Sequence, residues 1–209
     1  MRLSIAANGD VRVTLPAWTS YKTAEDFVRS KAGWIAAHQR TADRHVLQHG
    51  QLVGKAHRLH FEASNATASI NTRIVQNLVR VTFPAEHSSE SPAVQKAAQT
   101  AAVRALRKEA NALLPQRLQT LAVQTGFEFA SVDVKQLKSR WGSCSSKKEI
   151  TLNLFLMQLP WHLIDYVLVH ELVHTKVMRH GAPFWQEFEK HVPNAKRLRQ
   201  EIHEFQPVL

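Results

Sequence analysis

The stretch Tyr166–Trp185, YVLVHELVHTKVMRHGAPFW, decides how the rest of the chain is interpreted. Within it, His170 and His174 are four residues apart and Glu171 follows the first of them, in an H-E-x-x-H pattern. On an α-helix this spacing places both imidazoles on one face, where they can bind the same ion. Zinc accepts imidazole nitrogens, and the adjacent glutamate can serve as a general base for a water molecule at the metal.

A catalytic zinc usually keeps three protein ligands and one open position, so the pattern requires a third ligand, for which His180 is the candidate. In an unbroken helix His180 would lie about 15 Å along the axis from His170, too far to share an ion. We therefore expect the helix to end between Lys176 and His180 and the chain to fold back. Gly181 is expected to permit the reversal through a positive φ, and Pro183 to start the next helix.

The H-E-x-x-H pattern is unlikely to arise by chance. In a chain with 12 histidines, random placement produces roughly 0.04 matches. The apolar run Tyr166–Val169 before the pattern is typical of a buried helix, and Pro160 can begin that helix. The alternative interpretation is a buried helix with two incidental histidines. After the site, Trp185 and Phe188 are predicted to pack beneath the metal.

The composition is that of an ordinary globular protein. The 209 residues, 44% of them hydrophobic and 21% charged, indicate one domain or two small ones. No apolar run reaches about 18 residues, so no membrane span is predicted, and Met1–Asp10 becomes polar too soon for a signal peptide. The single cysteine, Cys144, excludes an intrachain disulfide. These features predict a cytoplasmic protein; they do not indicate an oligomeric state.

The formal net charge is +10, and the excess is spread along the chain. Residues 1–90 hold 11 basic and 7 acidic side chains, and residues 91–209 hold 16 and 10. Such a balance favours contact with polyanions, including weak contact with nucleic acid, although a basic surface also serves solubility alone. The densest cluster consists of Lys135, Lys138, Arg140, Lys147 and Lys148.

Residues 1–85 are predicted to form a small β-rich unit with one helix. Asn8-Gly9 between two short alternating runs indicates a hairpin. Thr23, with Asp26 three residues on, is expected to cap the helix. His57 and His60 lie in or beside a strand and are not expected to bind metal. Further strands are predicted at 58–62, 68–71 and 78–83.

Residues 86–92 are polar and are predicted to form a linker to a second domain, residues 93–209. Pro92 opens a long helical pattern that is expected to support the site from behind. Pro115 is expected to kink or divide this helix, and Gly126 to end it.

The segment between this helix and the metal helix reads as a short mixed sheet. Strands are predicted at 132–137 and 149–156, the second of which could offer its edge to an extended peptide. The intervening GSCSSKK, residues 142–148, superficially suggests a phosphate-binding loop, but a strand follows it where such a loop requires a helix. A final helix is predicted at 194–205.

These residues in combination resemble the YgjP-like metallopeptidase family. The resemblance rests on RWGSC at 140–144, ITLN at 150–153, DYV at 165–167, HELVH at 170–174, His180, and FW at 184–185. The family is related to SprT-like proteases, which degrade proteins crosslinked to DNA, and to gluzincin-type zinc peptidases. The resemblance implies that His170, His174 and His180 bind one Zn²⁺ and that Glu171 is the catalytic base.

The resulting hypothesis is an α+β protein whose β-rich N-terminal unit precedes a zincin-like catalytic domain. It would be a zinc-dependent metallopeptidase acting on a peptide or protein substrate. Four further residues are candidates for substrate or transition-state contacts: Arg140, Trp141, Asn153 and His203. A nucleoside triphosphate pyrophosphatase is one alternative, but magnesium-dependent enzymes of that kind prefer carboxylate ligands. A non-catalytic nucleic-acid-binding module with structural zinc is another, and it would have a closed four-ligand site.

Overall fold

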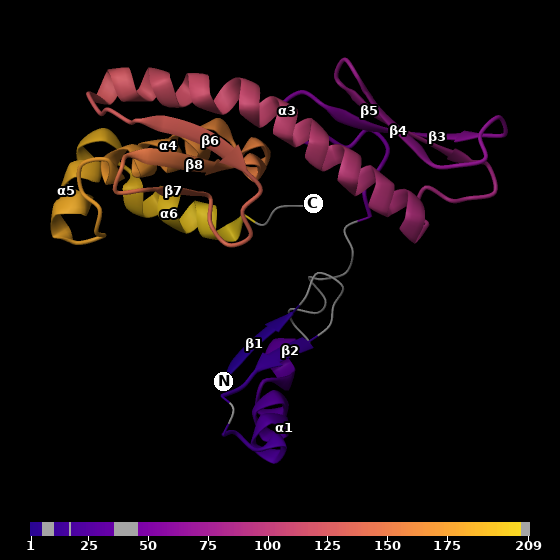
Figure 1. Ribbon diagram of the computed structural model, residues 1–209, viewed down its shortest axis with the longest axis horizontal. Helices are drawn as coiled ribbons and strands as arrows, with labels where there is room; N and C mark the ends of the chain where they lie inside the picture. The colour runs from indigo at the N-terminus through magenta and orange to yellow at the C-terminus, as the bar shows by residue number, and fades with distance from the viewer. Residues whose placement is uncertain (6–10, 17, 36–45, 206–209) are drawn as a thin grey trace. The chain divides into compact units, whose positions relative to one another are not determined.

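The computed structural model describes residues 1–5, 11–16, 18–35 and 46–205. The chain divides into two compact units, residues 1–46 and residues 47–209. Helices and small sheets are both present, so the predicted α+β class is confirmed (Figure 1). The predicted linker at 86–92, between domains at 1–85 and 93–209, stays a prediction.

The first unit contains the predicted hairpin. Strands β1 (Arg2–Ile5) and β2 (Val11–Thr14) pair antiparallel, while the Asn8-Gly9 turn lies outside the described residues. Helix α1 (Tyr21–Ser30) follows, and the prediction that Thr23 caps it is wrong. Ser20 is the cap: its backbone is extended, and its Oγ accepts a hydrogen bond from the Thr23 N–H at 3.2 Å.

The second unit begins with a three-stranded sheet in the order β3-β5-β4. Its outer strands pair with β5 in opposite senses, β3 parallel and β4 antiparallel. The strand predicted to start at residue 68 starts at residue 71 instead. Leu59, Val79 and Val81 are buried on the inner face. The strand bounds are β3 Arg58–Ser64, β4 Asn71–Val75 and β5 Leu78–Pro84.

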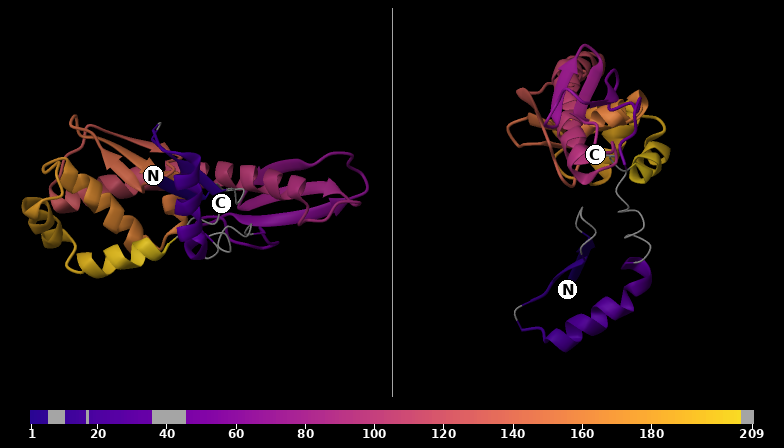
Figure 2. Two further views of the ribbon diagram at one scale, coloured as in Figure 1. Left: turned by 90° about the horizontal axis from the view of Figure 1, so that it is seen from below. Right: turned by 90° about the vertical axis from the view of Figure 1, so that its right-hand side faces the viewer.

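The long helix α3 (Pro92–Thr125) extends past both sheets of this unit (Figures 1 and 2). It runs without a break through Pro115, so the expectation that proline divides it is wrong. Proline removes one helical hydrogen bond, but Leu114 and Leu118 on either side are fully buried and hold the helix in the core. Gly126 ends it with φ of 74°, as predicted.

The second sheet has the order β6-β8-β7, which makes β8 the central strand. The strand predicted at 149–156 ends at Asn153, because the Asn153 side chain accepts the Phe155 N–H at 3.2 Å and starts the short 3-10 helix η1. The edges of this sheet are therefore β6 and β7, and the prediction that the strand at 149–156 offers an edge to a peptide is wrong for β8. The bounds are β6 Ser131–Lys135, β7 Gly142–Cys144, β8 Glu149–Asn153 and η1 Leu154–Gln158.

Three helices complete the unit: α4 Trp161–His174, α5 Ala182–His191 and α6 Ala195–Glu204. Helix α4 contacts α3, β7, α5 and α6. Arg117 of α3 binds both carboxylate oxygens of Asp165 on α4, at 2.7 and 2.5 Å, and so fixes the two helices against each other. Within the described part of the chain, no helix is long and apolar enough to cross a membrane.

Candidate metal centre and active site

Helix α4 ends at His174, slightly before the predicted interval. The chain then folds back, but the predicted positive φ at Gly181 is wrong, because its φ and ψ of −92° and −174° are those of extended backbone. The chain instead reverses in a three-residue turn over residues 179–181, in which the Gly181 N–H donates to the Arg179 carbonyl at 2.8 Å. Gly181 then caps α5, and Pro183 occupies its first turn.

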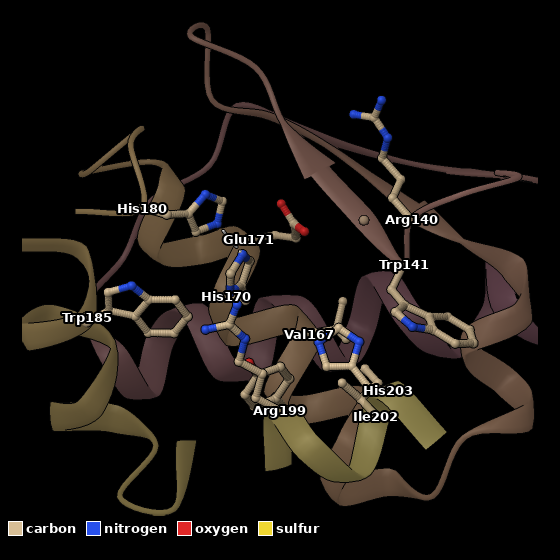
Figure 3. A pocket seen from close by; sticks show the side chains of 12 residues that line it. Arg140, Trp141, Val167, His170, Glu171, His180, Trp185, Arg199, Ile202 and His203 are labelled. Carbon is tan, nitrogen blue, oxygen red and sulfur yellow. Dashed lines mark hydrogen bonds between the residues drawn. The ribbon is translucent and has the colours of Figure 1, made fainter. Parts of the chain in front are cut away.

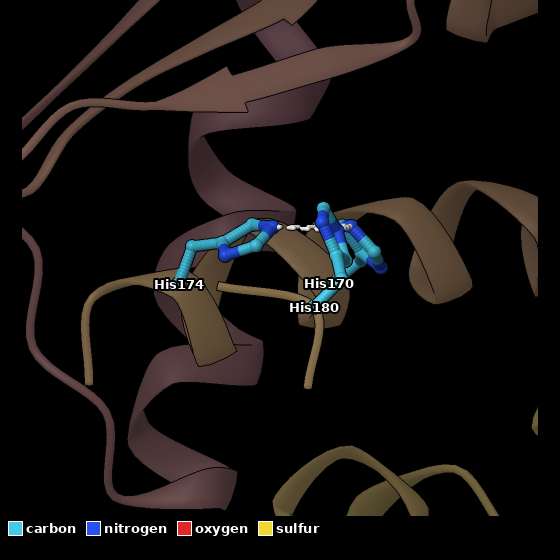
Figure 4. Close-up of side chains that lie close together, drawn as sticks. All are labelled: His170, His174 and His180. Carbon is cyan, nitrogen blue, oxygen red and sulfur yellow. Dashed lines mark hydrogen bonds between the residues drawn. The ribbon is translucent and has the colours of Figure 1, made fainter. Parts of the chain in front are cut away.

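This reversal brings the three predicted ligands together (Figure 4). The Nε2 atoms of His170 and His174 are 3.2 Å apart, those of His174 and His180 3.1 Å, and those of His180 and His170 2.9 Å. Zinc with tetrahedral Zn–N bonds of about 2.0–2.1 Å separates two ligand nitrogens by about 3.3 Å. The three side chains therefore fit one ion of the size of zinc.

The rings of His170 and His174 are in the state that a metal requires. The His174 Nδ1–H donates to the Val177 carbonyl at 3.1 Å, which leaves Nε2 free to bind an ion. Burial, together with the nearby His174 and His180, lowers the pKa of His170 to about 3, so this ring is neutral at physiological pH. The His170 Nδ1 is buried and has no hydrogen-bond partner among the described residues.

An aromatic side chain that the sequence analysis did not select contacts all three histidines. The ring centroid of Phe184 lies 4.9 Å from that of His170, 4.6 Å from His174 and 4.8 Å from His180. Phe184 and Phe188 are fully buried, whereas Trp185 lies farther away, at 6.4 and 6.2 Å from His170 and His180. Phe184 is therefore the aromatic residue that packs most closely against the three histidines.

Glu171 is buried beside the edge strand β7. A Cβ atom placed on Gly142 would lie only 2.7 Å from the Glu171 Oε1, so the strand approaches the carboxylate as closely as it does because this position is glycine. Burial raises the pKa of Glu171 to about 8, against the opposing effect of Arg140. A divalent cation bound next to it would favour the ionised form.

A cavity of about 630 Å³ opens beside His170, His180 and Glu171 (Figure 3). Three of the predicted contact residues, Arg140, Trp141 and His203, line it. Arg199 also lines it and was not selected from the sequence, although its four-residue spacing from His203 places the two on one helical face.

Asn153, the fourth candidate contact, is not among the described residues that line the cavity. It is buried, and its amide donates to the carbonyls of Leu137 and Arg140 at 3.0 and 2.9 Å. Asn153 therefore holds in place the segment that carries Arg140 and Trp141 into the cavity wall.

Comparison with known proteins gives one match over nearly the whole chain. The family model of the YgjP-like metallopeptidase domain matches residues 1–205. Among solved structures, the metallopeptidase zymogen of Pyrococcus abyssi abylysin is 29% identical, with a TM-score of 0.40 over 43% of this chain and 91% of that one. The zymogen of Methanocaldococcus jannaschii jannalysin is 20% identical, with a TM-score of 0.39 over 44% and 94%. No curated protein matches the chain.

Proposed function

Because the chain belongs to the YgjP-like metallopeptidase family, we propose that it cleaves peptide or protein substrates with one zinc ion held by His170, His174 and His180, and with Glu171 as general base. The observation that carries this proposal is the convergence of three Nε2 atoms within 3.2 Å of one another, next to a buried carboxylate. Neutral imidazoles are donors that zinc prefers.

The residues around the cavity supply the remaining parts of peptide hydrolysis. A zinc ion at the three histidines would polarise the scissile carbonyl and lower the pKa of a water molecule. Glu171 accepts the proton of the attacking water and passes it to the leaving amine. An extended peptide can pair with the backbone of edge strand β7, which places its bonds beside Glu171. Arg140 and His203 are the candidates for stabilising the oxyanion.

The alternative chemistries have less support. Magnesium-dependent cleavage of nucleotide phosphoanhydrides would call for several carboxylates, but Glu171 is the only acidic residue in the cavity lining of the described chain. A closed structural zinc site would call for four ligands, and the cluster found within the described ranges has three.

The proposal retains two further expectations, weak contact with nucleic acid through the basic surface and a cytoplasmic location.

Glu171→Gln tests the proposal, because it preserves the size of the side chain and removes its basic oxygen. We expect the variant to keep one zinc per chain and its thermal midpoint, and to lose about 10²–10⁴-fold or more in turnover. Zinc content, melting temperature and cleavage of casein, a protein–DNA conjugate and nucleoside triphosphates are measured. Glu128→Gln makes the same change on an exposed side chain and should behave as wild type. Full turnover by Glu171→Gln with full zinc would show that another group activates the water.

A further inference from the structure

We propose that the catalytic cavity selects substrates that place a carboxylate beside the scissile bond, and that Arg199 binds this carboxylate. The inference rests on the proposed peptidase function and specifies its substrate class. Its basis is the distribution of charge in the cavity wall, where Arg140, Arg199 and His203 are lining residues and Glu171 is the only acid among the described lining residues. Glu171 is buried against Gly142, and of the two arginines it is Arg140 that acts on its charge. Arg199 is therefore the lining arginine without an acidic partner among the described residues.

The Arg199 guanidinium has no anionic partner within the described structure. The guanidinium lies over the ring of Trp185, with its Cζ 5.2 Å from the centroid. The nearest acid along α6, Glu201, is already engaged by His162 at 2.5 Å and by Arg197 at 3.0 Å. A guanidinium that stacks on an aromatic ring keeps its N–H groups in a fixed plane, ready for bidentate binding of a carboxylate.

The position of Arg199 limits where the carboxylate must lie in the substrate. Val167 is three residues before His170 on α4 and lines the same cavity, so the cavity extends from the metal ligands along that helix (Figure 3). Arg199 projects from α6 toward this space. A residue bound there is next to the bond that Glu171 and the histidines act on. Trp141 and Ile202 provide apolar wall for the carbon stem of such a residue.

Two sources can supply this carboxylate. One is the side chain of an aspartate or glutamate next to the scissile bond, and the other is the free C-terminus of a peptide cut close to its end. Both present the same planar anion to a guanidinium. The experiment therefore needs one comparison for each source.

The test uses the zinc-loaded full chain and internally quenched peptides in two matched pairs. In the first pair the residue beside the cleaved bond is Glu or Gln, and in the second the C-terminus is a free acid or an amide. We expect wild type to prefer the charged member of at least one pair by about tenfold or more in kcat/KM. Arg199→Gln should abolish the preference and Arg199→Lys should retain part of it. Arg197→Gln removes a solvent-exposed charge from the same helix and should retain all of it.

A binding measurement separates this inference from the proposed function. Zinc-loaded Glu171→Gln is titrated calorimetrically with the same peptides, with and without Arg199→Gln, after melting curves establish that each variant is folded. Tighter binding of the charged peptide that depends on Arg199 supports the inference even if no peptide is cleaved, in which case only the proposed function fails. Equal binding and turnover of both members of both pairs in wild type would overturn the inference. So would a preference that Arg199→Gln leaves unchanged.

Discussion

Gly142 is the residue on which the position of Glu171, the proposed general base, depends. An added Cβ would lie 2.7 Å from the Glu171 Oε1, 2.9 Å from its Cγ and 3.0 Å from its Cδ, all too close for a side chain. Glu171 and Gly142 both line the cavity, so a side chain at position 142 would push the carboxylate into that space. Strand β7 and the Glu171 side chain can therefore lie this close together only because residue 142 is glycine.

We predict that Gly142→Ala displaces the Glu171 carboxylate and leaves the three histidines intact. A misplacement of about 1 Å can cost on the order of 10²-fold in rate, so kcat should fall by about 10–100-fold while zinc content is unchanged. Steady-state kinetics and metal analysis check this. Gly33→Ala is the control, because an added Cβ there meets no atom within 4 Å. Wild-type kcat in Gly142→Ala would contradict the proposed contact.

His180 is the proposed ligand whose position depends on the chain reversal after α4. It is exposed, so His180→Ala should leave the fold largely intact while removing one of three donors. We predict a loss of zinc affinity greater than about 100-fold, since even changes to residues that only support the ligands cost about 10–100-fold. Competition with a chelator measures it. The control is His162→Ala, at an exposed histidine that is paired with Glu201. Unchanged zinc affinity in His180→Ala would exclude His180 as a ligand.

At the scale of elements, a buried glutamate joins the first sheet of the second unit to α3. Glu109 accepts the backbone N–H groups of Lys55, Ala56 and His57 at 2.5, 3.0 and 2.9 Å, and its Oε1 lies 2.5 Å from the His57 Nδ1. Burial alone would raise the pKa of Glu109, but these hydrogen bonds outweigh it, and the net pKa is lowered. The loop at 54–57 is thus wrapped around an ionised carboxylate.

The lowered pKa predicts how stability depends on pH. A carboxyl whose pKa is lower in the folded state stabilises the protein above its unfolded pKa of about 4.3, and this contribution is lost as the pH falls through the folded value. Glu109→Gln should therefore be less stable than wild type by about 1–3 kcal/mol at pH 7, with a smaller difference at pH 3. Urea unfolding at both pH values tests this against Glu128→Gln. A difference that does not shrink in acid would argue against an ionised Glu109.

At the scale of the whole molecule, the net charge of +10 predicts contact with polyanions. Within the basic cluster, Lys135 is paired with Asp133 at 3.0 Å, whereas Lys147 and Lys148 lie on the turn between β7 and β8. Each phosphate contact contributes about −0.9 to the slope of log K against log salt for duplex DNA. Reversing both lysines should therefore flatten the slope.

We predict weak, salt-sensitive binding of wild type to duplex DNA and a slope reduced by up to about 1.8 in Lys147→Glu/Lys148→Glu. Fluorescence anisotropy across a salt series measures it. Arg107→Glu/Lys108→Glu makes the same change of charge on exposed residues of α3 and is expected to lose less of the slope. An affinity that does not respond to salt would discard nucleic-acid contact by this surface.

Local sequence determined the features that depend on neighbours in the chain. The four-residue spacing of His170 and His174 determined that both donors share one helical face, because helical geometry alone sets that relation. Pro92 and Gly126 marked the ends of α3 for the same kind of reason, since each restricts or frees its own backbone. The α+β class also followed from such periodicities. The need for a chain reversal before His180 followed from the rise of a helix, which would separate His170 and His180 by about 15 Å.

Only the tertiary structure decided which distant segments meet. Strands β6 and β7 became the edges of their sheet because both pair with β8, an order that no local pattern specifies. Asn153 was buried at the end of β8 with its amide on the Leu137 and Arg140 carbonyls, and Arg199 was brought to the cavity wall by the packing of α6 against α4. These placements depend on contacts between residues far apart in sequence, which form because the apolar faces of sheets and helices are buried against one another.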